Sequence, residues 1–122
     1  MFRTMIEPKE EFKFSKANAV TAGETSVYTW TVPSTLNYFR GHFPENPVLP
    51  AVAIVDACLE LIRLEKGLSN APYLRNLKSL KVNHVIQPND SLRIEVGQVA
   101  QQWRIHWFLN DKTVVDFVSE LI

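Results

Sequence analysis

Three prolines spaced three residues apart, followed at once by a long apolar run, constrain this chain more than any other feature. The prolines are Pro44, Pro47 and Pro50. Each lacks a backbone N–H, and each favours extended geometry in the residue before it. The stretch from Arg40 to Pro50 therefore predicts an ordered, irregular loop, and this loop carries His42.

The apolar run that follows predicts one long helix, from about Pro50 to Lys66. Proline is favoured in a first helical turn, and Gly67 is a suitable residue to end the helix. Nearly every residue from Val48 to Leu59 is apolar or small. Such a run indicates that most faces of the front half are buried. It is too short, and too charged at its end, to span a membrane.

Two features of this helix suggest chemistry. No Ser, Thr, Asp or Asn comes directly before it, so its first N–H groups lack an obvious side-chain cap and favour a negative or polarised oxygen. Asp56 lies inside the apolar part, where an ionised carboxylate is costly unless it is paired. On spacing alone, the favoured interpretation of Asp56 is the start of a polar stripe with Glu60 and Arg63. A lone loop histidine such as His42 is commonly bonded to backbone.

Composition limits the remaining possibilities. A chain of 122 residues fits one domain, here taken as residues 1–122. Thirteen basic and thirteen acidic residues cancel, so neither nucleic acid nor an anionic membrane is expected as a partner. The single cysteine, Cys58, lies in the apolar run and is interpreted as a packing residue. It excludes an intrachain disulfide and fits a reducing, cytoplasmic location. The charged N-terminus predicts no secretory leader.

Alternating and β-branched residues predict six strands around the helix. Two come before it, running from Phe12 toward Val20 and over Thr25–Val32, and are expected to form a hairpin. Four come after it, with their cores at Leu77–Gln87, Leu92–Val96, Trp103–Leu109 and Val114–Leu121. Short turns join most of them, including a hairpin turn at Asn110-Asp111-Lys112, which favours antiparallel neighbours. The pattern predicts an α+β fold in which a curved antiparallel sheet wraps around one central helix.

The loop and helix together carry a family resemblance. Gly41-His42-Phe43-Pro44, then Asn46-Pro47-Val48-Leu49-Pro50, then Asp56 fourteen residues after the histidine resemble the 3-hydroxyacyl-[acyl-carrier-protein] dehydratases. These enzymes have the hotdog fold, which is the architecture predicted above. The similarity in element order covers almost the whole chain. It implies dehydration of a 3-hydroxyacyl thioester to the trans-2-enoyl thioester, in fatty acid or related acyl or polyketide biosynthesis, without a cofactor or metal.

The resemblance also implies roles for individual residues. His42 is expected to be the base that removes the C2 proton, and a neutral imidazole suits this task near pH 7. Asp56 is expected to help the C3 hydroxyl leave as water. Family members carry Glu at this position, or Asp in a branch that includes dehydratase/isomerases. Backbone N–H at the helix start, at Ala51, is expected to hold the thioester oxygen. Phe43, Pro50 and Val52 are the other expected substrate-binding residues.

The resemblance further implies a homodimer and an acyl carrier protein as the substrate's carrier. Ala51 and Asp56 lie about 7.5 Å apart along one helix axis and on different sides of it. One helix cannot easily aim both at the same carbon. In the family the two catalytic side chains of a site come from different subunits.

Two departures from the family pattern keep other functions open. The family normally has Gly where Ala51 stands, and a small residue where Glu45 stands. A non-catalytic hotdog protein that binds an acyl carrier is therefore one alternative. A hotdog acyl thioesterase, which activates water with a helix carboxylate, is another. His84 and His106 are interpreted as exposed strand residues without a catalytic role.

Overall fold

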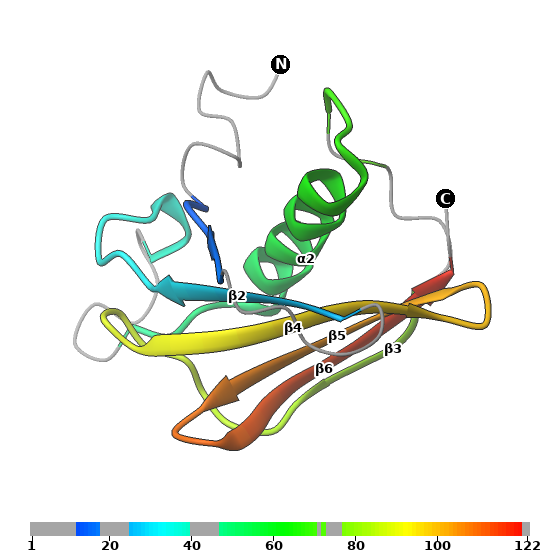
Figure 1. The fold of residues 1–122 in the computed structure, drawn as a ribbon. Coiled ribbons are helices and arrows are strands. Elements are labelled where there is room, and N and C mark those ends of the chain that lie inside the picture. Colours follow the sequence, from blue (N-terminus) through cyan, green and yellow to red (C-terminus); the bar gives the residue numbers. More distant parts are fainter. Residues whose placement is uncertain (1–11, 18–24, 40–46, 71, 73–76, 121–122) are drawn as a thin grey trace.

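The computed structural model describes residues 12–17, 25–39, 47–70, 72 and 77–120, in which one long helix lies against one face of a sheet (Figure 1). The helices are the single-turn 3-10 helix η1 (Asn37–Phe39) and α2 (Ala51–Lys66). The strands are β1 (Ser15–Lys16), β2 (Ser26–Thr31), β3 (Leu77–Val82), β4 (Ser91–Val99), β5 (Gln102–Leu109) and β6 (Lys112–Glu120).

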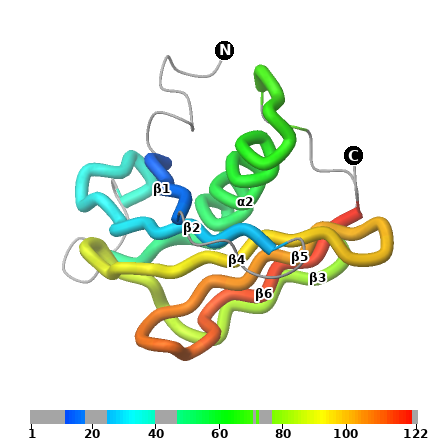
Figure 2. Tube along the Cα trace, in the orientation of Figure 1, coloured from blue at the N-terminus to red at the C-terminus, as the bar shows by residue number. Residues whose placement is uncertain are grey.

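The six strands form one antiparallel sheet in the order β1-β2-β4-β5-β6-β3 (Figure 2). Tyr28 of β2 lies opposite Ile94 of β4, which lies opposite Trp107 of β5. Residues that face each other across strands share one side of the sheet. A continuous apolar surface therefore runs across the strands on the side that faces α2.

The core lies between this surface and one side of α2. The helix contributes small and medium-sized apolar residues that are buried, namely Ala53, Ile54, Ala57, Cys58, Leu61 and Ile62. The sheet contributes larger ones, including Tyr28, Trp30, Ile94, Trp103, Ile105, Trp107 and Phe117. Small residues on the helix allow it to lie close to bulky side chains of the sheet. The expected burial of the front half holds on this side only, because Ala51 and Val52 at the helix start are exposed.

The two hairpins after the helix have turns with the backbone twist that antiparallel strands prefer. Asn110 and Asp111, in the expected turn between β5 and β6, have φ of 52° and 68°. Ala100 and Gln101, between β4 and β5, have φ of 51° and 70°. Positive φ at both central residues matches the right-handed twist of the flanking strands.

Two predicted strands are shorter in the structure. β1 covers only Ser15–Lys16, and the rest of the segment expected to run toward Val20 lies partly outside the described residues. β3 ends at Val82 and does not extend to Gln87. The reason is that β3 pairs with β6 at the sheet edge, whereas β4 lies on the far side of β5. The chain must leave β3 to cross over, and Leu49 N–H donates to the Ile86 carbonyl at 2.7 Å during that crossing.

Gly67 ends α2 in the left-handed conformation, as predicted. Its φ is 68°, and the Gly67 and Leu68 N–H groups close the helix on the Leu64 and Arg63 carbonyls. A Cβ added at Gly67 meets no atom within 4 Å, so the cost of a side chain is conformational rather than steric.

We expect Gly67→Ala to lower the free energy of unfolding by about 1 kcal/mol, because alanine resists positive φ. Gly67→Asn is the matched control, since asparagine tolerates this conformation, and it should cost less. Urea denaturation of the three proteins measures both differences. Equal stability of the alanine variant and the wild type contradicts the assignment of Gly67 as the helix terminator.

Candidate functional site

Asp56 lies on the side of α2 that the sheet leaves open. The neighbouring residues on this side, Val52, Val55 and Leu59, are exposed or partly exposed, and Val52 is 60% exposed. Asp56 is itself half-buried. Its Oδ2 accepts a hydrogen bond of 2.6 Å from the Tyr38 hydroxyl. A carboxylate with one fixed donor on an accessible helix face can bind or polarise a further hydroxyl group.

The polar stripe suggested by the spacing of Asp56, Glu60 and Arg63 is absent in the structure. Glu60 is only 2% exposed, and its two carboxylate oxygens accept bonds of 2.9 Å and 2.8 Å from the Arg63 guanidinium. Arg63 also donates to the Leu68 carbonyl at 3.0 Å. The bonds to Glu60 raise the pKa of Arg63 above its usual value. The Glu60–Arg63 pair stabilises the C-terminal end of the helix, and Asp56 takes no part in it.

No side chain of the described residues caps the start of α2. Pro50 is the N-cap residue with extended backbone angles, and its carbonyl accepts from the N–H groups of Ala53 and Ile54. Within the described part of the chain, the N–H groups of Ala51 and Val52 donate to no acceptor. Both residues are exposed. A helix start with free N–H groups and a favourable dipole can hold a thioester oxygen.

His42 and Phe43 lie outside the described residues, so their predicted roles remain predictions. The chain on either side of them is fixed by described contacts. Before them, Tyr38 bonds to Asp56; after them, buried Leu49 bonds through its backbone to Ile86. The segment that carries His42 therefore joins two points that are anchored beside α2.

Glu65 forms a second polar cluster near the other end of the helix. Its carboxylate accepts from Ser26 Oγ at 2.9 Å and from the Tyr28 hydroxyl, and it pairs with Lys16 Nζ at 3.2 Å. Burial opposes ionisation, but these three partners outweigh it and lower the pKa of Glu65. Burial and the bond to Glu65 raise the pKa of Tyr28. Because three donors already engage both of its oxygens, Glu65 ties α2 to β1 and β2 and is a weaker candidate for a catalytic group than Asp56.

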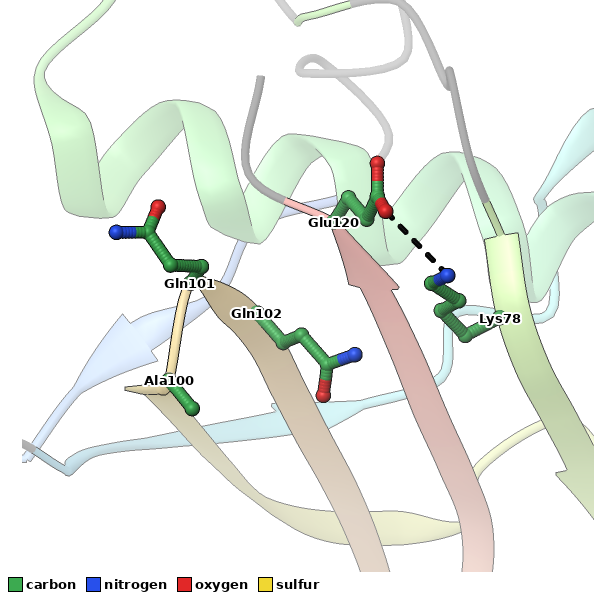
Figure 3. Close-up of a pocket in the computed structure, with 5 residues that line it drawn as sticks. All are labelled: Lys78, Ala100, Gln101, Gln102 and Glu120. Atoms are coloured by element: carbon green, nitrogen blue, oxygen red, sulfur yellow. Dashed lines mark ion pairs between the residues drawn. The ribbon is translucent and has the colours of Figure 1, made fainter.

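Surface pockets near this end of the molecule lack catalytic side chains. One is lined by Glu65, Gly97, Gln98 and Trp103. Another is shown in Figure 3 and is lined by Lys78, Ala100, Gln101, Gln102 and Glu120. Lys78 and Glu120 form an ion pair of 3.3 Å in it. The carboxylates that line them, Glu65 and Glu120, are already engaged by other side chains, and Asp56 lines neither pocket.

The contacts of the other two histidines and of the cysteine indicate structural rather than catalytic roles. His84 is exposed but lies just after β3 rather than within it, and its Nδ1 contacts the Val85 carbonyl at 2.7 Å. His106 is a half-buried residue of β5 whose Nε2 lies 3.4 Å from Asp116 Oδ1. Cys58 is fully buried, and burial raises the pKa of its thiol, which confirms it as a packing residue.

No set of three His, Cys, Asp or Glu side chains among the described residues is grouped to hold a metal ion. None of the helices in that part of the chain is both long and apolar enough to cross a membrane.

Comparison with known proteins supports the sequence resemblance. The 3-hydroxyacyl-[acyl-carrier-protein] dehydratase FabZ of Lactiplantibacillus plantarum is 32% identical over 92 residues, which cover 71% of this chain and 63% of that protein. FabZ of Legionella pneumophila (strain Philadelphia 1) is 33% identical over 89 residues, covering 62% and 59%. The chain thus spans about three fifths of the length of these curated relatives.

Solved structures confirm the predicted hotdog fold. A chain of the dehydratase heterocomplex ApeI:P from Xenorhabdus doucetiae matches with a TM-score of 0.70 and 22% identity, covering 88% of this chain and 96% of that one. An uncharacterised protein from Erwinia carotovora subsp. atroseptica matches with a TM-score of 0.66 and 21% identity, covering 88% and 94%. The family model described as ApeI-like, ApeI dehydratase, matches residues 18–120. The chain therefore belongs to the ApeI-like dehydratase family.

Proposed function

We propose that this protein dehydrates a 3-hydroxyacyl thioester to the trans-2-enoyl thioester. The observation that carries the proposal is the placement of Asp56 on the open face of α2, five residues after a helix start whose first N–H groups have no acceptor among the described residues. The helix thus offers an acceptor for a hydroxyl and donors for a thioester oxygen, and in a site shared between subunits these two groups come from different copies of α2. Membership of the ApeI-like dehydratase family supports the same reaction.

In the proposed reaction, His42 removes the proton from C2, and the electron pair of that C–H bond forms the C2–C3 double bond. The C3–O bond breaks at the same time. Asp56 accepts a hydrogen bond from the C3 hydroxyl and orients it for departure. The proton taken by His42 returns to the departing hydroxyl, so that water is released and the imidazole is neutral again. The Ala51 N–H stabilises the negative charge that builds on the thioester oxygen.

The proposed site is completed by a second subunit. β3 forms an edge of the sheet, and apolar side chains at and just after it are exposed, with Val82 at 44% and Val85 at 53%. An exposed apolar edge strand is a ready surface for pairing with another chain. The open face of α2 adds exposed Val52. A homodimer that covers both surfaces would bring His42 of one subunit to Asp56 of the other.

An acyl carrier protein is the proposed carrier of the substrate. The curated relatives named above are dehydratases of acyl-carrier-protein substrates by name. The Xenorhabdus doucetiae neighbour comes from a dehydratase heterocomplex, so a second, different chain is the alternative partner to a second copy.

The proposed function is tested by incubating the purified protein with 3-hydroxyacyl and trans-2-enoyl thioesters of several chain lengths, each loaded on a carrier protein. Intact mass spectrometry then follows the loss or gain of one water. Turnover in either direction supports the proposal, because the reaction is reversible. Release of free carrier without an enoyl product supports the thioesterase alternative. Absence of any change across all chain lengths rejects the proposal.

We expect Ala51→Gly to leave turnover within a few-fold of the wild type or to raise it. The N–H that holds the thioester oxygen remains, and only a methyl group is removed. Helix stability should fall by at most roughly 1 kcal/mol, because glycine is a weak helix former. Steady-state kinetics and thermal unfolding measure the two effects. A wild type that is inert, paired with an active Ala51→Gly variant, contradicts this and favours the acyl-binding alternative.

A further inference from the structure

We propose that Tyr38 is a positioning residue that fixes the carboxylate of Asp56 for the reaction. This inference rests on the proposed function and adds a residue to its machinery. The Tyr38 hydroxyl donates to Asp56 Oδ2 over 2.6 Å, across eighteen positions of sequence. Of the described residues, Tyr38 is the one whose side chain donates a hydrogen bond to Asp56.

The ring of Tyr38 is held by packing, so that its hydroxyl has a defined position. The ring stacks on Phe12, with centroids 5.9 Å apart and planes 23° from parallel. Phe12 is buried and contacts the edge of Trp30 with centroids 5.5 Å apart. Tyr38 itself belongs to η1. This turn is closed by a hydrogen bond of 3.1 Å from the Phe39 N–H to the backbone carbonyl of buried Leu36. A rigid aromatic support of this kind positions a hydroxyl better than a flexible side chain does.

The hydrogen bond leaves the carboxylate partly available. A tyrosine hydroxyl that donates to one carboxylate oxygen restrains rotation of the Asp56 side chain and leaves Oδ1 without a donor from the described residues. That oxygen can then accept the C3 hydroxyl of the substrate in a fixed direction. Misplacing a catalytic group by about 1 Å can cost a hundredfold in rate.

The same chemical pair elsewhere on α2 provides a contrast. Tyr28 donates to Glu65 near the end of the helix, but Ser26 and Lys16 bind that carboxylate as well. Glu65 is thus filled by donors and serves the fold. Asp56 receives one side-chain donor from the residues that the structure describes, and it has an accessible surface. The Tyr38–Asp56 pair is therefore suited to a reacting group, and the Tyr28–Glu65 pair provides a control with the same chemistry.

Tyr38→Phe tests the inference, because it removes the hydroxyl and keeps the ring that stacks on Phe12. We expect kcat to fall about tenfold while KM stays within about threefold, since an interaction felt mainly in the transition state affects kcat. Tyr28→Phe is the matched control, and it should leave kcat unchanged while lowering the denaturation midpoint. An unchanged kcat in Tyr38→Phe, with an active wild type, overturns the inference.

A double-mutant cycle shows whether Tyr38 acts through Asp56. Added to Asp56→Ala, the Tyr38→Phe change should cause no further loss of the residual rate, because the carboxylate that it positions is gone. A further loss of about tenfold, equal to that in the wild type, overturns the inference even if the enzyme is active. An inactive wild type instead rejects the proposed function, so the two failures are distinguishable. Urea midpoints of all four proteins confirm that each variant is folded when it is assayed.

Discussion

Asp56→Asn is expected to lower dehydratase turnover by roughly 10²–10⁴-fold, the range that positioned acid–base groups contribute. The change keeps the size of the side chain and an oxygen that can accept from Tyr38. It removes the negative charge that orients the departing C3 hydroxyl. A quenched time course with a 3-hydroxyacyl carrier protein, analysed by mass spectrometry, measures the rate of enoyl product formation. Binding of the substrate should change little, so KM is expected to stay within a few-fold of the wild-type value.

Asp111→Asn is the matched control for this change. Asp111 is exposed in the turn between β5 and β6 with φ of 68°, a conformation that asparagine adopts readily. The control should retain full turnover and an unchanged melting temperature. Near-wild-type rates in Asp56→Asn reject Asp56 as the group that assists departure of the hydroxyl. They leave open a reaction carried out by the loop histidine alone.

The sequence predicted the element order because local signals were strong there. The apolar run between Pro50 and Gly67 predicted a helix of nearly the correct length, and the structure places it at Ala51–Lys66. Alternation of apolar and polar residues predicted β4 and β5, whose inner residues are buried as expected. The turn residues Asn110 and Asp111 predicted the last hairpin, and both have positive φ in the structure. These features depend on contacts that are close in sequence.

Strand order could not be predicted, because it depends on distant pairing. Nothing in the sequence of β3 indicates that it pairs with β6 at the sheet edge rather than with β4. For the same reason β3 was predicted to extend to Gln87, although Val82 is its last residue. The turn at Ala100 and Gln101 was also missed, since neither residue is a usual signal for positive φ.

The candidate site was predicted in part. Asp56 and the uncapped start at Ala51 followed from an acidic residue inside the apolar part of the helix and from the lack of a capping residue before it. The structure shows a half-buried Asp56 carboxylate bonded to Tyr38 and no side-chain cap at Pro50, and the catalytic roles of these groups remain predictions. Tyr38 was not predicted, because the hydrogen bond joins residues eighteen positions apart and the ring alone suggests packing. Glu65 gave no signal either, as a charged residue near a helix end is usually solvated. His42 remains a prediction from resemblance.

Mixing two inactive variants restores activity if the site is shared between subunits. We expect His42→Ala alone and Asp56→Asn alone each to be nearly inactive as homodimers. Each then has two damaged sites, because a shared arrangement takes His42 of every site from one subunit and Asp56 from the other. After unfolding and refolding together at equal concentration, half of the dimers should be mixed. One site in each mixed dimer is intact and the other lacks both groups.

Roughly a quarter of wild-type turnover should therefore return, given random pairing in a two-fold symmetric dimer. Light scattering on each sample supplies the control, and it should give about twice the chain mass of 14.0 kDa. Refolding each variant separately and then assaying a fresh mixture should give almost no activity unless subunits exchange. If the co-refolded mixture stays inactive while the samples are dimeric, both groups of a site belong to one subunit. A monomer that turns over substrate excludes the shared site altogether, because no second α2 is then present to supply Asp56.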